Sequence, residues 1–178
     1  YFIQNNYPRE KIAISDNSSE LLKFKILKLA SKHQIKLFQN TTMSLGEHFA
    51  YALNLCDSDY VTFFHDDDLI NFHYSEYKKN IDFYFKKKET ISINFNGHHF
   101  ETNKVAKFKN VLWKFSNQEL RVSKENLIER YLDNDEGGVA PWCGYTYNLG
   151  VYKNKIIKII NNIDLKDPYF DTYLILQM

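Results

Sequence analysis

The apolar and polar positions of the first 70 residues predict strands that alternate with helices. Three short apolar runs are typical of strands: residues 12–14, 35–38 and 60–64. Two segments between them repeat apolar residues at helical spacing: residues 21–33 and 45–56. Ser44 and Glu47 have the spacing of a capping box at the start of the second helix. This order predicts an α/β sheet with crossover helices.

The helix over residues 21–33 should have an apolar side and a basic side. Its apolar repeat falls at Leu22, Ile26, Leu29 and Ala30, and lysines lie on the other face. The apolar side is therefore expected to face the sheet.

The second half of the chain is less regular. Helical spacing continues through residues 76–88, residues 89–95 alternate like a strand, and residues 123–132 form a short amphipathic pattern. Residues 132–154 are rich in glycine, aromatic and turn residues. That composition predicts either a loop or a pair of strands around a binding surface.

Composition and charge narrow the function classes. With 178 residues, 44% of them hydrophobic and 16% aromatic, the chain can form one core, and we expect one domain. A formal charge of +1 argues against a global attraction to nucleic acid or to an anionic membrane. Cys56 and Cys143 stand far apart without metal-ligand spacing, and no apolar run approaches the length of a membrane span. We therefore expect a soluble cytoplasmic protein whose electrostatic function is local.

The strongest chemical signal is a run of three carboxylates. Asp66, Asp67 and Asp68 directly follow the apolar strand at residues 60–64. Adjacent carboxylates repel one another, and oxygen ligands without softer neighbours suit Mg²⁺ or Mn²⁺, whose coordination a substrate diphosphate can complete. The alternative is that they cap a helix or lie in a turn, although a cap needs only one of them.

A second polar cluster ends the first strand. Asn17, Ser18 or Ser19 can cap the helix that follows, which leaves Asp16 able to accept hydrogen bonds from a base or a ribose. In a doubly wound sheet, ligands bind at the carboxyl ends of the strands, so both acidic clusters are expected at one rim.

Three motifs together resemble a known family. SDNSSE at residues 15–20, SLGEHFAYALNLC at 44–56 and DSDYVTFFHDDDLI at 57–70 are similar, in sequence and separation, to the nucleotide-binding half of family-2 glycosyltransferases. The resemblance implies a GT-A-like (Rossmann-like) α/β fold, a mixed sheet with flanking helices. Residues 1–178 would form one partial domain, with 1–70 as the nucleotide-binding half and 71–178 as the acceptor-side half. The family's first strand, with its Pro-Thr-Tyr-Asn-like turn, has no counterpart here, and the chain starts without Met and ends inside an apolar repeat, so we expect truncation at both ends.

By this resemblance, the site residues of the donor side can be named. Nucleotide contacts would come from Asp16, Asn17, Ser18 and Asp66. Asp67 and Asp68 would bind Mn²⁺ or Mg²⁺, with Asp66 as an alternative ligand. Relatives often carry a carboxylate where His65 stands, so the resemblance does not fix which two aspartates bind the metal.

The residues expected to act on the acceptor lie near the end of the chain. LKDPYFDTYLILQM resembles the segment that supplies the general base of inverting members, with Asp171 as the base and Asp167 as the alternative. Asp171 would equally suit a helix N-cap. Acceptor or sugar contacts would come from Trp142, Gly144 and Tyr145, although aromatic rings are as often packed in a core.

The resemblance implies inverting transfer of a sugar from a nucleotide-diphosphate sugar to an acceptor hydroxyl. The family's usual setting is bacterial surface polysaccharide or lipopolysaccharide synthesis, with a saccharide or lipid-linked saccharide acceptor and no nucleic acid partner. Lipid-linked acceptors would bring the protein to the inner face of the cell membrane. Two alternatives stay open: a non-catalytic nucleotide- or sugar-binding module, and another Asp-dependent phosphoryl-transfer enzyme, for which HDDDLIN lacks the expected Thr or Ser.

Overall fold

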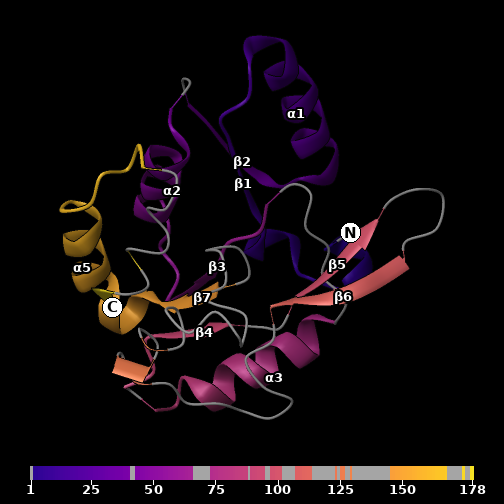
Figure 1. Cartoon of the computed structure of the whole chain (residues 1–178). Helices are drawn as coiled ribbons and strands as arrows, with labels where there is room; N and C mark the ends of the chain where they lie inside the picture. The colour runs from indigo at the N-terminus through magenta and orange to yellow at the C-terminus, as the bar shows by residue number, and fades with distance from the viewer. Residues whose placement is uncertain are drawn as a thin grey trace. The chain divides into compact units, whose positions relative to one another are not determined.

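The computed structural model gives a mixed α/β chain (Figure 1). It describes residues 2–40, 43–65, 73–87, 89–94, 97–101, 107–113, 123, 125–126, 129, 145–167, 174 and 177–178. Two compact units divide the chain, and each is described by itself. The first comprises Tyr1–Asp57, Asp66–Glu89 and Leu165–Pro168, and the second Ser58–His65, Thr90–Asp164 and Tyr169–Met178.

A strand, a helix and a second strand open the first unit. β1 (Ala13–Asp16) pairs in parallel with β2 (Lys36–Gln39), and the register places Asp16 opposite Gln39. Parallel strands need a crossover connection, which α1 (Glu20–His33) provides. α1 ends where Gln34 adopts a left-handed conformation, with φ 56°, and its N–H bonds back to the last turn. The predicted strand, helix and strand are confirmed.

α1 presents a different face to the strands than the sequence predicted. Ala30 is its one fully buried residue, whereas Leu22 and Leu29 are 44% and 54% exposed. The apolar repeat therefore located the helix correctly but did not identify its inner face.

α2 (Leu45–Asn54) starts with the predicted capping box. The Ser44 hydroxyl accepts from the Glu47 N–H at 3.3 Å, and the Glu47 carboxylate accepts from the Ser44 N–H at 2.8 Å. Phe49 and Leu53, which lie four residues apart on one side of α2, are 2% and 0% exposed. These contacts fix where α2 begins and which side is buried.

The remaining elements of the first unit are a helix and two short 3-10 turns. α3 (Tyr74–Tyr84) buries Ile81, and the turns span Ile3–Asn5 and Arg9–Lys11. Tyr7, between the two turns, packs its ring 5.2 Å from that of Tyr74.

The second unit is built on a central strand. β7 (Tyr145–Asn148) pairs antiparallel with β3 (Tyr60–Thr62) on one side and with β4 (Ser92–Asn94) on the other, and all four of its residues are buried. β5 (Gly97–Glu101) and β6 (Lys107–Trp113) form a separate antiparallel pair. The sequence predicted one sheet for the first three strands, but among the described residues β3 pairs with β7.

The helix α5 (Leu149–Ile160) follows β7 directly and was not predicted. Asn148 ends the strand and caps the helix, because its side-chain oxygen accepts from the Val151 N–H at 3.3 Å. Ile156 is fully buried against the core of this unit. Of the helices in the described part of the chain, none is long and apolar enough to cross a bilayer.

Candidate functional site

A buried carboxylate ends β1. Asp16 is 3% exposed. Its Oδ1 accepts from the Ser18 N–H at 2.9 Å, and its Oδ2 accepts from the Gln39 side-chain amide at 2.8 Å. The Gln39 contact follows from the parallel register, which sets the two strand ends side by side.

These contacts keep Asp16 ionised. Burial alone would raise the pKa of its carboxyl, but hydrogen bonds from Gln39 and Ser18, together with the nearby Lys23 ammonium, outweigh burial and hold the pKa below its usual value.

Asn17 fastens the strand-end loop to the start of α2. Its side-chain amide donates to the Met43 carbonyl at 2.9 Å and accepts from the Met43 N–H at the same distance. Met43 directly precedes Ser44, the N-cap of α2. Asn17 was considered as a cap for α1, but the residue at that position is Ser19, whose side chain makes no capping hydrogen bond.

A serine and a histidine link β1 to α2 beside this loop. The Ser15 hydroxyl and His48 Nε2 lie 2.7 Å apart. Burial disfavours the imidazolium form and lowers the pKa of His48 below its usual value, although the Asp16 carboxylate acts in the opposite direction. His48 is therefore neutral at pH 7.

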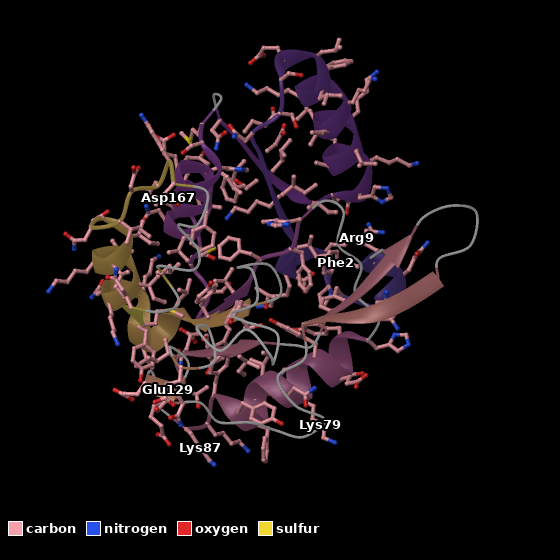
Figure 2. The ribbon with its side chains drawn as sticks, in the orientation of Figure 1. Phe2, Arg9, Lys79, Lys87, Glu129 and Asp167 are labelled. Carbon is pink, nitrogen blue, oxygen red and sulfur yellow. The ribbon has the colours of Figure 1, made fainter. Side chains whose placement is uncertain are left out.

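A segment from the far end of the chain also reaches the start of α2. The Ser44 hydroxyl donates to the Leu165 carbonyl at 3.1 Å. A Cβ added at Gly46 would lie 2.3 Å from the same carbonyl oxygen, so glycine permits this close approach. Asp167, labelled in Figure 2, is half-buried two residues further on. The first unit thus brings together residues 15–18, the start of α2 and residues 165–167.

Most of the other predicted site residues lie outside the part of the chain that the structure describes. These residues are Asp66, Asp67, Asp68, Trp142, Gly144 and Asp171. Tyr145 is 4% exposed in β7 and stacks on Tyr147 with ring centroids 6.1 Å apart, which favours core packing over a sugar contact. His65 follows β3 and is half-buried. Within the described ranges, no three His, Cys, Asp or Glu side chains gather closely enough to hold a metal ion.

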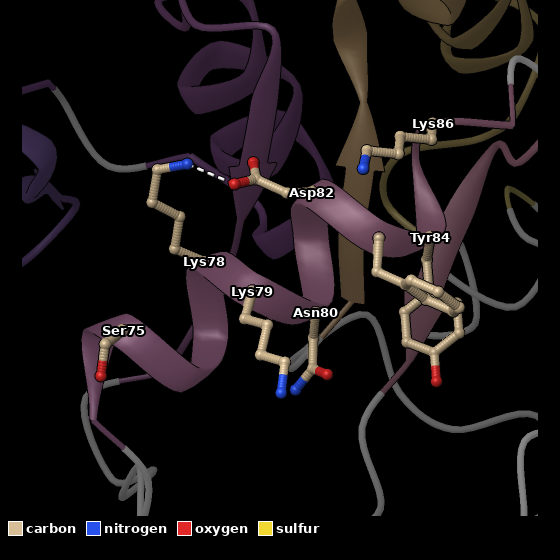
Figure 3. A pocket seen from close by; sticks show the side chains of 8 residues that line it. Ser75, Lys78, Lys79, Asn80, Asp82, Tyr84 and Lys86 are labelled. Atoms are coloured by element: carbon tan, nitrogen blue, oxygen red, sulfur yellow. Dashed lines mark hydrogen bonds and ion pairs between the residues drawn. The ribbon is translucent and has the colours of Figure 1, made fainter.

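A hollow of about 690 Å³ lies along α3 and the turn after it (Figure 3). Lys78 and Asp82 on its wall form an ion pair. Every side chain that lines it is exposed or half-exposed. A surface built this way has no buried polar group to orient a ligand, so we do not place the site there.

Sequence reasoning missed Gln39 and His48 as neighbours of the strand-end loop. Gln39 lies beside Asp16 because of the parallel register, which the apolar pattern of the predicted strand at residues 35–38 does not fix. For His48 there is no sequence signal either, since its contact depends on how α2 is rotated about its axis.

The fold and the site define this chain as a mixed α/β protein with a buried, ionised carboxylate at the end of a parallel strand pair. In comparisons with protein-family models, curated proteins and solved structures, the chain has no match.

Proposed function

We propose that this chain carries the nucleotide-binding part of an inverting, family-2-type glycosyltransferase of GT-A fold. The observation that carries the proposal is Asp16, a buried carboxylate kept ionised at the carboxyl end of β1. Ligands of α/β sheets bind at that end, where an ionised acceptor can receive hydrogen bonds from the N–H groups of a base or from ribose hydroxyls.

The contacts around Asp16 support a binding role because they fix the loop. Asn17 is tied to Met43 through both its side-chain donor and its acceptor, so the loop is positioned before a ligand arrives. A preformed loop loses less conformational entropy on binding. Nucleoside binding here would position the sugar carbon for attack.

The acceptor step needs a base. A carboxylate, Asp171 or alternatively Asp167, would take the proton of the acceptor hydroxyl as its oxygen attacks the sugar carbon and the bond to the diphosphate oxygen breaks, with inversion. Asp167 lies in the segment that contacts the start of α2. Asp67 and Asp68, with Asp66 as an alternative, would hold Mn²⁺ or Mg²⁺, which when bound would neutralise charge on the leaving diphosphate.

Calorimetric titration with UDP- and GDP-sugars, with and without Mn²⁺, tests this proposal. We expect binding that requires the metal and that weakens about 10-fold or more in Asp16→Asn, because a hydrogen bond to a charged acceptor is lost. Asp82→Asn, at an exposed carboxylate on α3, is the matched control and should bind as the wild type does.

Two outcomes would refute the proposal. Sugar binding without metal would favour a non-catalytic binding module. Absence of any nucleotide binding by the folded chain would remove the assignment of Asp16 to the nucleoside.

A further inference from the structure

α1 exposes most of its large apolar side chains. Five large apolar side chains on this one helix are between 44% and 78% exposed: Leu21, Leu22, Phe24, Leu27 and Leu29. Single exposed leucines are ordinary on protein surfaces, whereas a contiguous group marks an interaction site. Leu21 and Phe24, at 78% and 62%, are the most exposed of the group.

The same helix concentrates positive charge. Residues 20–33 hold four lysines and one glutamate, a formal charge of +3 in a chain whose total is +1. Lys25, Lys28 and Lys32 are all exposed and lie on one side of the helix, because their spacings of three and four residues bring them into line. The local charge therefore differs strongly from that of the rest of the chain.

The apolar and basic residues share one surface. Leu21 stands four residues before Lys25 in the lysine row, and Lys28 Nζ lies 4.6 Å from the centre of the Phe24 ring. Leu22 and Leu29, seven residues apart, flank the row on one side. Lysine stems are long enough to lie along apolar neighbours while the ammonium groups reach outward.

We propose that α1 is an interfacial helix that docks the chain on an anionic phospholipid surface, with Leu21 and Phe24 entering the acyl boundary and Lys25, Lys28 and Lys32 contacting lipid phosphates. An anionic bilayer offers both an apolar layer and a negative surface, which matches the mixed apolar and basic residues of this face. A nucleic acid would satisfy the lysines but would not shelter the exposed leucines. This inference stands independently of the proposed transferase activity.

Vesicle flotation of the full chain tests the proposal. Vesicles of phosphatidylcholine alone are compared with vesicles in which about a third of the lipid is phosphatidylglycerol, at low and high salt, since surface charge attraction is screened by salt. We expect binding to the anionic vesicles at low salt. Neutralising Lys25, Lys28 and Lys32 to Gln should weaken it roughly 100-fold, at about fivefold per lysine.

The chain offers matched controls on and beside α3. Lys79, Lys86 and Lys87 are exposed, and changing all three to Gln removes the same charge without altering α1. Phe83 is 59% exposed, close to the 62% of Phe24. With anionic vesicles, Phe24→Trp should show a blue-shifted emission that brominated lipids quench, relative to the wild-type background, whereas Phe83→Trp should not.

Three results would overturn the proposal. The first is no binding to anionic vesicles, or binding that the α1 lysine variant leaves unchanged. The second is a chain that self-associates and shows the Phe24→Trp blue shift without lipid, which would make this face an interface between copies. The third is binding to RNA that depends on the lysines but is unaffected when Leu21 and Phe24 are both changed to Ser. Circular dichroism of each variant verifies that the helix is retained.

Discussion

An Asp16→Asn substitution alters the hydrogen bonds at the end of β1 without changing the size of the side chain. The new amide can still accept from the Ser18 N–H, but its nitrogen then faces the Gln39 amide nitrogen, which is also a donor. A hydrogen bond to a charged group contributes about 1.5–3 kcal/mol to stability. Because Gln39 is exposed and water can partly replace the lost partner, we expect the free energy of unfolding to fall by about 1.5 kcal/mol, the lower end of this range.

A second substitution distinguishes this mechanism from general damage. Gln39→Glu, added to Asp16→Asn, restores one donor facing one acceptor with their positions exchanged. The rescue should be partial, because the Gln39 amide also donates to the Lys23 carbonyl at 3.1 Å and a carboxylate cannot. Urea unfolding with an unchanged m-value measures each free energy of unfolding. Additive effects of the two substitutions, or an Asp16→Asn variant that unfolds like the wild type, would show that the contact with Gln39 does not stabilise the fold.

The pH dependence of the same comparison has a fixed sign. The pKa of Asp16 is lower in the folded state, so its stabilisation is complete above the ordinary aspartate pKa, near 3.8, and is lost as pH falls through the folded-state pKa. The difference in free energy of unfolding between the wild type and Asp16→Asn should therefore be constant around neutral pH and should shrink below about pH 4. Nucleotide binding should not recover in the double variant, because its carboxylate stands on β2 instead of β1.

Two further perturbations test the contacts between β1, α2 and the segment at Leu165. Burial lowers the pKa of His48, so the folded state holds its imidazole neutral and loses stability as the pH falls below about 6.5, where the unfolded chain takes up the proton. In urea titrations, His48→Gln should therefore reduce the decline of the free energy of unfolding below about pH 6.5. Gly46→Ala would place a Cβ 2.3 Å from the Leu165 carbonyl oxygen and should cost about 2 kcal/mol in thermal unfolding, and an unchanged midpoint would show that this approach is not tight.

Local patterns predicted the elements whose signals are contained within a few residues. The capping box of Ser44 and Glu47 lies within a single turn of chain, and the structure confirms it. The start of α5 depends on Asn148, which has to be recognised both as the last residue of a strand and as a helix cap. Because residues 132–154 are rich in aromatic and glycine residues, they were predicted as a loop or a pair of strands, and the double role of Asn148 was missed.

The candidate site was predicted only in part because its contacts are long-range. Asp16 was identified from its position after a strand. Its partner Gln39 stands 23 residues away, and their contact depends on the strand register, which apolar periodicity alone does not fix. The contact between Ser15 and His48, 33 residues apart, depends in addition on the rotation of α2.

The exposure of α1 has a geometric cause that a helical repeat cannot reveal. A helix of 14 residues is about 21 Å long, whereas the four-residue strands beneath it span about 13 Å, and the pair is about 5 Å wide from strand to strand. Two strands of this size can bury the side of α1 around Ala30, but they cannot bury apolar residues on its other sides. The leucines and Phe24 thus exceed what β1 and β2 can bury, and the nearby lysines specify a negatively charged partner for the remainder. Quenching of Phe24→Trp by brominated lipids, set against Phe83→Trp, measures directly whether that partner is a bilayer.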